Sequence, residues 1–367
     1  MSVNTDVLIV GGGIIGSACA RELTLAGRKV TVVEPEGRNG QAWQAAAGLL
    51  APQIEAAESD PMLEMGLAGR EWYSSVREEL ENSSGSSLLL QLSGIMSLAR
   101  TESEEEVLRE RVADQRQHGL LCDWLEADEA KEQLPWLPDI RGAILAPQDG
   151  AVDPARVVEA LVANGDRLGV RRVKDKITGL ETEKGQVTGA RGTERYSAGT
   201  VILAAGAWTG RMEGLPRPVS VEPVRGQMIA FERPGAMADA ILYSGGRYML
   251  TRENEVIVGS TMEHAGFTAE NSPESISRIT GSAVDMCRLL AGVSPARTWV
   301  GLRPGTPDGL PIIGREPRCE GLWYATGHGR NGVLLAGITG IVLAQMMAGE
   351  ATLESVAAFR PERFWDW

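Results

Sequence analysis

Two stretches of the chain carry glycines at the spacing G-x-G-x-x-G, a pattern that can bind the diphosphate of a dinucleotide. The first stretch contains Gly11, Gly13 and Gly16, and the second contains Gly327, Gly329 and Gly332. Where a strand turns into a helix, such glycines permit a tight turn and let phosphate approach backbone N–H groups, and the helix dipole favours the negative charge. The two stretches therefore predict either two nucleotide sites or two contacts with one extended ligand.

The first pattern lies in a complete strand–helix–strand unit. Residues 6–10 are a short apolar run typical of a buried parallel strand, Gly27 ends the following helix, and residues 29–33 return as a second strand. Glu34 ends that strand, where a carboxylate can bind ribose hydroxyls and disfavours a 2′-phosphate. This predicts a site for FAD or NAD rather than NADP, with a tight turn that holds no ligand as the alternative. The predicted contacts are Gly11, Gly13, Ile14, Ile15, Gly16 and Glu34.

The second pattern lacks the second half of such a unit. Residues 321–326 are a plausible strand and residues 333–348 a plausible helix, but Glu350 follows the helix directly, with no second strand before it. The helix N-terminus could instead face a group that gains negative charge during turnover. The pyrimidine edge of a flavin is such a group, so a single flavin nucleotide could contact both turns.

Nine short motifs, which include both glycine turns, are distributed along the whole chain. They are VLIVGGGIIGSACA, QAAAGLLAPQIE, GAVDPARVVEAL, VILAAGAWTG, PVRGQMI, ILYSGGRYMLTR, VIVGSTME, VGLRPGTPDGLPIIGR and GHGRNGVLLAGITG. In this order and spacing the chain resembles the D-amino-acid-oxidase superfamily of flavoproteins, and within it the glycine oxidase (ThiO-like) branch. The resemblance implies an α/β (mixed α+β) fold, in which a Rossmann-like FAD-binding domain is interleaved with an antiparallel-sheet substrate domain.

The resemblance also implies FAD as the cofactor. Sarcosine-oxidase relatives attach FAD to a cysteine in the region of RPGTPDGLPIIG, and this segment contains no cysteine, so we expect non-covalent binding. Residues 44–53 would wrap the flavin ring, although a tightly packed turn is the alternative there. The contacts implied beyond the first turn are Ala45, Ala46, Ala47, Gly48, Ile177 (near adenine), Gly206, Trp208, Gly329, Arg330, Asn331, Gly332, Val333 and Leu334.

Four residues are candidates for the reacting end of the site. Arginine binds a carboxylate through its planar fork, and Arg303 and Arg330 each lie beside a glycine-rich turn. By the resemblance, Arg303 anchors the substrate carboxylate and Tyr248 contacts the same group. Arg330 would lie near flavin and substrate, and Met262 would line the pocket. The alternatives are a structural ion pair for either arginine and ordinary packing for the tyrosine and the methionine.

An α-amino acid held by its carboxylate needs few catalytic side chains. If its amine is neutral, its α-hydrogen can leave as hydride toward the flavin, so no general base is required. The imine then hydrolyses in water, and O₂ is reduced to H₂O₂. Two departures from the family pattern leave the substrate's size open: Gly246 stands where relatives often have histidine, and Ala51 where they often have glycine.

The implied function is oxidation of glycine, sarcosine or other N-substituted glycines, or small D-amino acids, with thiamine (thiazole) biosynthesis as a candidate pathway. An alternative enzyme is a D-amino-acid dehydrogenase that passes electrons to a non-oxygen acceptor. A non-catalytic flavoprotein scaffold is the alternative from another class. The retention of Arg303 and Tyr248 argues against a scaffold, because a scaffold needs no group that binds a carboxylate.

The motifs divide the chain into interleaved domains. Residues 1–85, 141–215 and 301–367 carry the FAD-binding signals, and residues 86–140 and 216–300 carry the strand-like patterns of a substrate domain. Residues 101–117 are expected to form an exposed, charged helix. Residues 333–348 are shorter than the ~20 residues of a spanning helix, so we expect a buried helix and no membrane contact.

Composition narrows the partners. A net charge of −13 argues against nucleic-acid binding, and three widely separated histidines argue against a metal site. The four cysteines show no paired spacing and no signal sequence is visible, which predicts a reducing, cytoplasmic location. We expect a small amino-acid or amine substrate and O₂ as partners. A homo-oligomer, a tetramer in related proteins, is implied by the resemblance alone.

Overall fold

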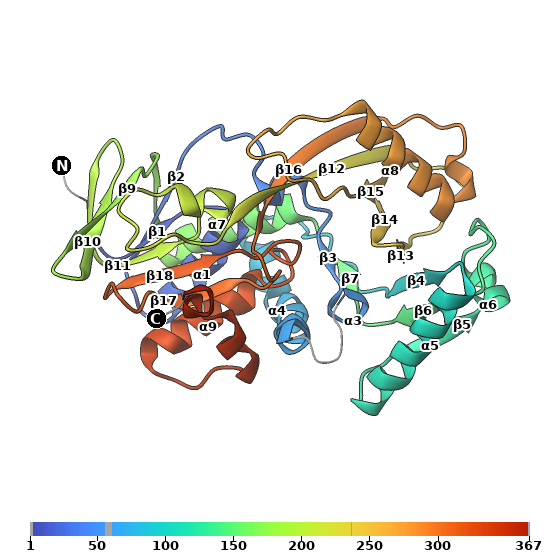
Figure 1. Ribbon diagram of the computed structural model, residues 1–367, viewed down its shortest axis with the longest axis horizontal. Coiled ribbons are helices and arrows are strands. Elements are labelled where there is room, and N and C mark those ends of the chain that lie inside the picture. The colour runs from blue at the N-terminus through green and yellow to red at the C-terminus, as the bar shows by residue number, and fades with distance from the viewer. Residues whose placement is uncertain (1–2, 56–60, 236, 366–367) are drawn as a thin grey trace.

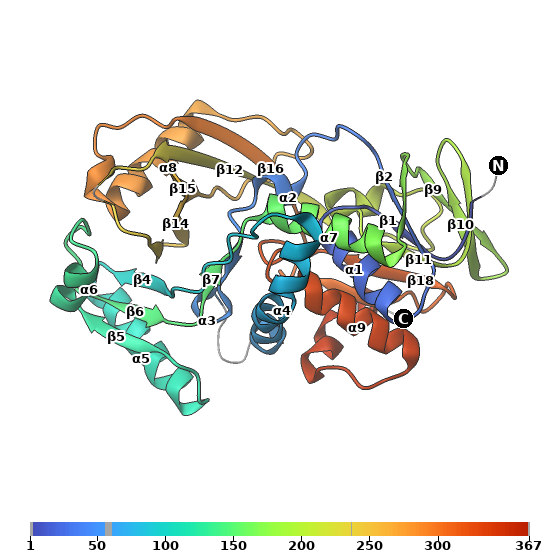
Figure 2. The same ribbon diagram turned by 180° about the vertical axis from the view of Figure 1, so that it is seen from behind.

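The computed structural model describes residues 3–55, 61–235 and 237–365, which form two large β-sheets. Figures 1 and 2 show the first sheet and its helices at one end of the molecule and the second sheet at the other, with long strands of the second sheet reaching back between them. Each sheet is built from segments far apart in the sequence, as the interleaved motifs predict.

The first sheet has the parallel order β18–β11–β1–β2–β8, with β17 antiparallel to β18 at one edge and β10 and β9 added beside β11. Its strands are β1 (Val3–Val10), β2 (Val30–Glu34), β8 (Arg171–Lys174), β9 (Gly179–Glu183), β10 (Gln186–Arg191), β11 (Arg195–Leu203), β17 (Ile312–Arg315) and β18 (Leu322–Thr326). The predicted strands 6–10, 29–33 and 321–326 are confirmed, within a few residues, as β1, β2 and β18.

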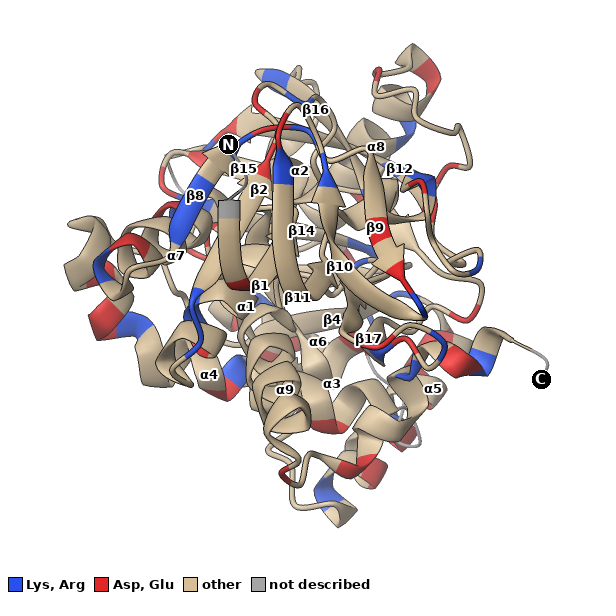
Figure 3. Ribbon diagram, turned by 90° about the vertical axis from the view of Figure 1, so that its left-hand side faces the viewer, with Lys and Arg blue, Asp and Glu red and all other residues tan. Residues whose placement is uncertain are grey.

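Four helices cover this sheet: α1 (Ile14–Leu25), α4 (Pro61–Ser84), α7 (Pro154–Leu168) and α9 (Ala336–Ala348). α1 packs against α7 and α9, and α4 packs against the same two helices. α9 carries no charged residue and is uniformly tan in Figure 3. It begins three residues later than the predicted 333, because residues 332–335 still form a turn. None of the helices in the described part of the chain is long and apolar enough to cross a membrane.

The second sheet has the order β16–β12–β15–β14–β13–β4–β6–β5 and is antiparallel except where β13 pairs with β4. Its strands are β4 (Ile95–Ala99), β5 (Asp123–Glu126), β6 (Gly142–Ala146), β12 (Glu222–Glu232), β13 (Ile241–Ser244), β14 (Arg247–Arg252), β15 (Glu255–Gly259) and β16 (Arg297–Gly305). It therefore extends past the boundaries placed at 141 and 301, since β6 and the end of β16 pair within it.

Helices lie against both faces of the second sheet. They are α5 (Glu102–Gln117), α6 (Ala127–Gln133) and α8 (Pro273–Met286). Side chains alternate along β14: Met249 packs in the cluster that holds Ile279 of α8, while Tyr248 and Leu250 pack in the cluster that holds Leu108 of α5. α5 confirms the charged helix predicted at 101–117.

Short elements join the two sheets. β3 (Leu49–Leu50) pairs with β7 (Gly150–Ala151), and α2 (Ala42–Ala45) and α3 (Pro52–Glu55) flank them. The remaining elements are the 3-10 helices η1 (Gly206–Arg211), η2 (Arg288–Leu290), η3 (Glu354–Phe359) and η4 (Pro361–Phe364). After α9, the described residues 349–365 contain no strand, so the second glycine pattern does not belong to a complete strand–helix–strand unit.

Candidate cofactor and substrate site

The first glycine turn joins β1 to α1. Gly13 is the N-cap residue of α1. Because glycine has no side chain to accept hydrogen bonds from the first helical turn, the backbone N–H groups there are left for an anion. Close approach requires the glycines: a Cβ at Gly16 would lie 1.8 Å from the Gly11 carbonyl oxygen, and a Cβ at Gly11 would lie 2.4 Å from that of Ala204. The turn therefore has the features of a diphosphate site.

Glu34, the last residue of β2, lies directly beside this turn. Its Oε2 accepts a hydrogen bond from Gly12 N at 2.8 Å, and its Oε1 accepts one from Gln41. Burial raises the pKa of Glu34, while the Gly12 N–H and the charge of Arg38 oppose that rise. Arg38 in turn lies with its guanidinium 4.6 Å from the Trp208 ring. These contacts place a carboxylate and a cation where a ribose and its phosphates would bind.

Two cavities meet beside Glu34, Arg38, Ala205 and Trp208, which line both of them. The larger of the two, by the number of residues that line it, brings together most of the predicted residues: Gly13, Ile14, Ile15, Glu34, Ala45, Ala46, Ala47, Gly48, Gly206, Trp208, Tyr248, Arg303, Gly329, Arg330, Asn331, Gly332 and Val333. The smaller one contains Gly11 and Ile177. The structure thus forms one groove from the predicted adenine end to Arg303.

Three predicted residues line neither cavity. Gly16 and Leu334 lie behind the turns to which they belong, where Gly16 permits close packing and Leu334 is buried. Met262 is 57% exposed, and the structure does not bring it to the reacting end. The neighbouring carbonyl of Thr261 reaches the site instead, where it accepts a hydrogen bond from Arg303.

Tyr248 and Arg303 reach the cavity from the second sheet. The register sets Tyr248 and Met228 on either side of Gly259, so these two side chains share one face. The Tyr248 hydroxyl lies 3.4 Å from Met228 Sδ. Arg303 leans over Gly226, where a Cβ would lie 2.0 Å from Arg303 Nη1. Glycine at position 226 is therefore what leaves room for the arginine.

Arg303 is half-buried, and two residues that directly follow β15 hold its guanidinium. Nη1 donates to the Thr261 carbonyl at 3.1 Å and Nη2 donates to Ser260 Oγ at 2.6 Å. Burial lowers the pKa of Arg303, and Tyr248 opposes that effect. A guanidinium remains cationic even so. Because its hydrogen-bond partners in the described part of the chain are neutral, this cation has charge and N–H groups left for an anionic ligand.

Arg330, from the second turn, is already paired. Its Nη2 donates to Glu55 Oε1 at 2.9 Å and to the Tyr243 hydroxyl at 2.8 Å. Burial lowers the pKa of Arg330, but Glu55 and Tyr243 outweigh it and the net shift is upward. Glu55 is the last residue of the QAAAGLLAPQIE motif. Its position in this motif is the one feature of the sequence that could have identified it as a site residue. Among the described residues, the pair leaves Arg303 as the charge without an ion-pair partner at this end.

His328, in the second turn, has a defined tautomer. Thr339 Oγ1 donates to the Leu335 carbonyl at 2.7 Å, so it accepts from His328 Nε2, 3.0 Å away. Nδ1 is then a bare acceptor. Burial lowers the pKa of His328 to about 3, which keeps the ring neutral.

Further lining residues were not predicted from the sequence. They include Arg38, Gln41, Trp43, Met228 and His328, together with Glu55. Within the described residues, Trp43 Nε1 and His328 Nδ1 are buried polar atoms that lack a hydrogen-bond partner. Orphaned polar atoms around a cavity are expected where a ligand completes the site. Ala51 also lines the larger cavity, whereas Gly246 lies outside its lining.

A parallel sheet with a diphosphate turn, and a groove that runs from it to a half-buried arginine, define a dinucleotide-dependent oxidoreductase. A family model described as FAD dependent oxidoreductase (DAO) matches residues 6–346. The chain belongs to this family, and its cofactor is FAD.

Similar proteins agree with this assignment. The bifunctional protein ThiO/ThiG of Synechocystis sp. is 33% identical over 99% of this chain, which spans 55% of that relative. The glycine oxidase of Bacillus licheniformis is 32% identical over 98% of this chain and 97% of its own length. The crystal structure of the Geobacillus kaustophilus glycine oxidase matches with a TM-score of 0.94 and 28% identity, covering 100% of both chains.

Proposed function

We propose that this chain is an FAD-dependent amine oxidase for a small amino acid. Its substrate would be glycine, sarcosine or another N-substituted glycine, or a small D-amino acid. The product would be the imino acid, which hydrolyses to the oxo acid, with O₂ reduced to H₂O₂. The observation that carries the proposal is the half-buried guanidinium of Arg303 at the end of the FAD groove, which has only neutral hydrogen-bond partners among the described residues.

The residues of the chain would act by binding and orientation. Arg303 and Tyr248 would hold the substrate carboxylate, and bound FAD supplies the hydride acceptor. Glu55 neutralises Arg330, so the described residues of the cavity present one net positive charge at this end, that of Arg303. That charge matches a monocarboxylate whose amine is neutral. No role at the reacting end is proposed for Met262, because it lines neither cavity.

Pathway, acceptor and assembly are part of the proposal. The similarity to the ThiO/ThiG protein supports a role in thiamine (thiazole) biosynthesis. We propose a cytoplasmic homo-oligomer with non-covalently bound FAD. All four cysteines are described and buried, and none lines either cavity. Electron transfer to a non-oxygen acceptor is the alternative activity.

A peroxide assay on the FAD-loaded protein tests the proposal, with glycine, sarcosine, N-ethylglycine, D-alanine and D-proline as substrates. In Arg303→Met, kcat/KM should fall about 100-fold while FAD is retained, because a charge-assisted bond to the carboxylate is lost. Arg247→Met is the matched control: Arg247 lies on the same sheet and bonds Ser282 of α8, outside the cavity lining.

The outcomes separate the alternatives. Peroxide that depends on Arg303 and not on Arg247 supports the oxidase. Flavin bleaching with dye reduction but without peroxide would assign the dehydrogenase activity. Absence of bleaching with every substrate, in a protein that retains FAD, would contradict the proposal.

A further inference from the structure

The cavity segment 45–48 has no side chain longer than a methyl group, so other residues must position it. It consists of Ala45, Ala46, Ala47 and Gly48, all of which line the larger cavity. Backbone this close to a ligand determines how tightly the ligand is held, and its polar groups need partners. The question is therefore what holds the segment from behind.

One donor comes from Arg252, the last residue of β14. Its Nη2 donates to the Ala47 carbonyl at 2.5 Å and to the Val152 carbonyl at 2.7 Å. Its Nη1 lies 3.7 Å from Asp153 Oδ2. Burial lowers the pKa of Arg252, and Asp153 opposes that effect. A largely buried guanidinium thus joins the segment to the second sheet and to the start of α7.

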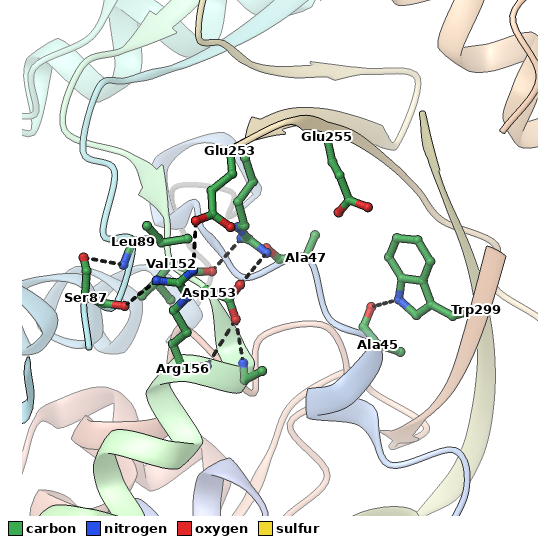
Figure 4. A network of polar contacts seen from close by, with 12 residues as sticks. Ala45, Ala47, Ser87, Leu89, Val152, Asp153, Arg156, Glu253, Glu255 and Trp299 are labelled. Atoms are coloured by element: carbon green, nitrogen blue, oxygen red, sulfur yellow. Dashed lines mark hydrogen bonds and ion pairs between the residues drawn. The ribbon is translucent and has the colours of Figure 1, made fainter. Parts of the chain in front are cut away.

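A second donor comes from Trp299 on β16. Its Nε1 donates to the Ala45 carbonyl at 3.1 Å (Figure 4). The Arg297 guanidinium lies 4.0 Å from the Trp299 ring centroid, and Arg297 also pairs with Glu255 at 2.6 Å. The indole is therefore held in place by neighbours that do not touch the segment.

The segment is also fixed at its glycine. Gly48 has φ +86°, and a Cβ there would lie 1.9 Å from the Val152 carbonyl oxygen. Val152 N donates to the Gly48 carbonyl at 2.9 Å. The carbonyls of Ala45, Ala47 and Gly48 are thus bound by donors from β16, from β14 and from the short link between β7 and α7.

We propose that Arg252 and Trp299 are positioning residues that hold the 45–48 segment against bound FAD. This inference rests on the proposed placement of the segment at the cofactor. It makes FAD retention depend on the second sheet, which also carries Arg303 and Tyr248. The second sheet then positions both the residues that bind the cofactor and those that bind the substrate. A substitution of Arg252 or Trp299 would therefore change the environment of the flavin although neither residue contacts it.

Release of FAD from the holoenzyme tests this proposal, followed by flavin fluorescence together with the visible absorption and circular dichroism of the bound flavin. Trp299→Phe keeps the ring against Arg297 and removes only the N–H donor. FAD release should become about fivefold to tenfold faster, because one hydrogen bond to a buried carbonyl is lost. Arg252→Lys keeps the charge but not the fork, and should have an effect of the same size.

Arg252→Met should release FAD more than about tenfold faster, because two carbonyls lose their donor. Arg156→Met is the matched control. Arg156 belongs to the same polar network, where it pairs with Glu253 at 2.9 Å, but it touches no carbonyl of the segment. Its FAD release and flavin spectra should match those of the wild type.

A purely structural role would lower the thermal midpoint without changing FAD release or the flavin spectra, and that result would overturn the proposal. If Arg252→Met fails to fold, Trp299→Phe and Arg252→Lys still decide. The measurement needs no substrate. Faster FAD release in a protein that oxidises none of the amino acids would therefore support this inference while contradicting the proposed function.

Discussion

The two glycine turns share one pattern of letters but differ in what surrounds them. In the first turn, Gly11 and Gly16 are required by backbone atoms 2.4 Å and 1.8 Å from their would-be Cβ positions. In the second, a Cβ at Gly327 would lie 2.6 Å from Thr306 Cγ2, but one at Gly332 would meet only His328 Cβ at 3.6 Å. Packing therefore enforces the first and third glycines of the first pattern, but only the first glycine of the second.

Their helices differ as well. α1 begins one residue after Gly13, the second glycine of its pattern, whereas α9 begins seven residues after the equivalent Gly329. Glu34 ends a strand and bonds the first turn, while Glu350 follows α9 directly and its side chain is exposed. The second turn is connected to α3 through its own Arg330, which pairs with Glu55. A sequence fingerprint identifies a nucleotide site only when the following strand completes it.

The strongest test of this contrast is Gly16→Ala. The added Cβ must displace the Gly11 carbonyl, so we expect a loss of stability of more than ~3 kcal/mol and little FAD-bound protein. FAD content per chain and the thermal midpoint measure the effect. If the variant binds FAD as well as the wild type does, the conclusion that packing requires glycine at position 16 is wrong.

The acidic residues give the next largest difference. Glu34→Gln removes a charged acceptor beside the first turn and should raise the Kd of FAD about 10- to 100-fold, since hydrogen bonds to charged groups are worth ~1.5–3 kcal/mol. Glu350→Gln, the counterpart by spacing in the second pattern, should leave the Kd unchanged. FAD titration of both variants checks this. Equal effects would mean that both patterns bind the nucleotide in the same way.

The support of the second turn predicts a pH effect. Glu55 belongs to α3, and Asp149 Oδ2 accepts hydrogen bonds from Gln53 N and Ile54 N of the same helix, each at 3.1 Å. Burial raises the pKa of Asp149 to about 7, against the opposing charge of Arg70. Because the folded pKa lies above that of the unfolded chain, the stabilisation from the bound proton is complete below about pH 4 and is lost as pH rises through 7.

Between pH 6 and pH 8 the holoenzyme should therefore lose ~1 kcal/mol of stability through this group. Thermal midpoints measured across that range should fall in the wild type, and should fall less in Asp149→Asn. If the thermal midpoint falls equally with pH in both proteins, Asp149 is not the cause of the fall, and its contact with the helix that carries Glu55 does not depend on pH.

Gly332→Ala should have the smallest effect. The new methyl group meets His328 Cβ at an ordinary contact distance, so stability should stay within ~0.5 kcal/mol of the wild type and FAD content should be unchanged. Gly16 and Gly332 have the same place in the glycine pattern, so comparing the two variants in the same assays separates the effect of packing from that of the sequence pattern. A large loss here would show that bound FAD needs the second glycine for its own contact.

Much of the fold was readable because local signals are strong in it. The β1–α1–β2 unit, the buried α9 and the charged α5 follow from apolar periodicity, glycine punctuation and charge. The limits of the second sheet were harder to predict. β6 and β16 lie beside flavin motifs in the sequence, yet they pair with strands far away along the chain. Non-local pairing leaves little trace in a single segment.

The site was readable in its residue types and less so in its contacts. Arg303 and Tyr248 lie in the predicted groove, whereas Met262 points elsewhere. The partners of Arg330 could not be found, because Glu55 and Tyr243 come from a short helix and a distant strand. Arg252 and Trp299, the donors to the carbonyls of Ala47 and Ala45, could not be predicted either, because they also lie on strands distant in the sequence.

The sequence by itself determined the class of ligand and the direction of the groove. Glycine spacing, the terminal acid of β2 and the order of motifs are local features, and local backbone geometry follows from them. Only the tertiary structure decided which charges are neutralised and which backbone carbonyls are held. Those outcomes depend on side chains that meet across two sheets, because burial and hydrogen bonding are set by neighbours in space, whatever their distance along the chain.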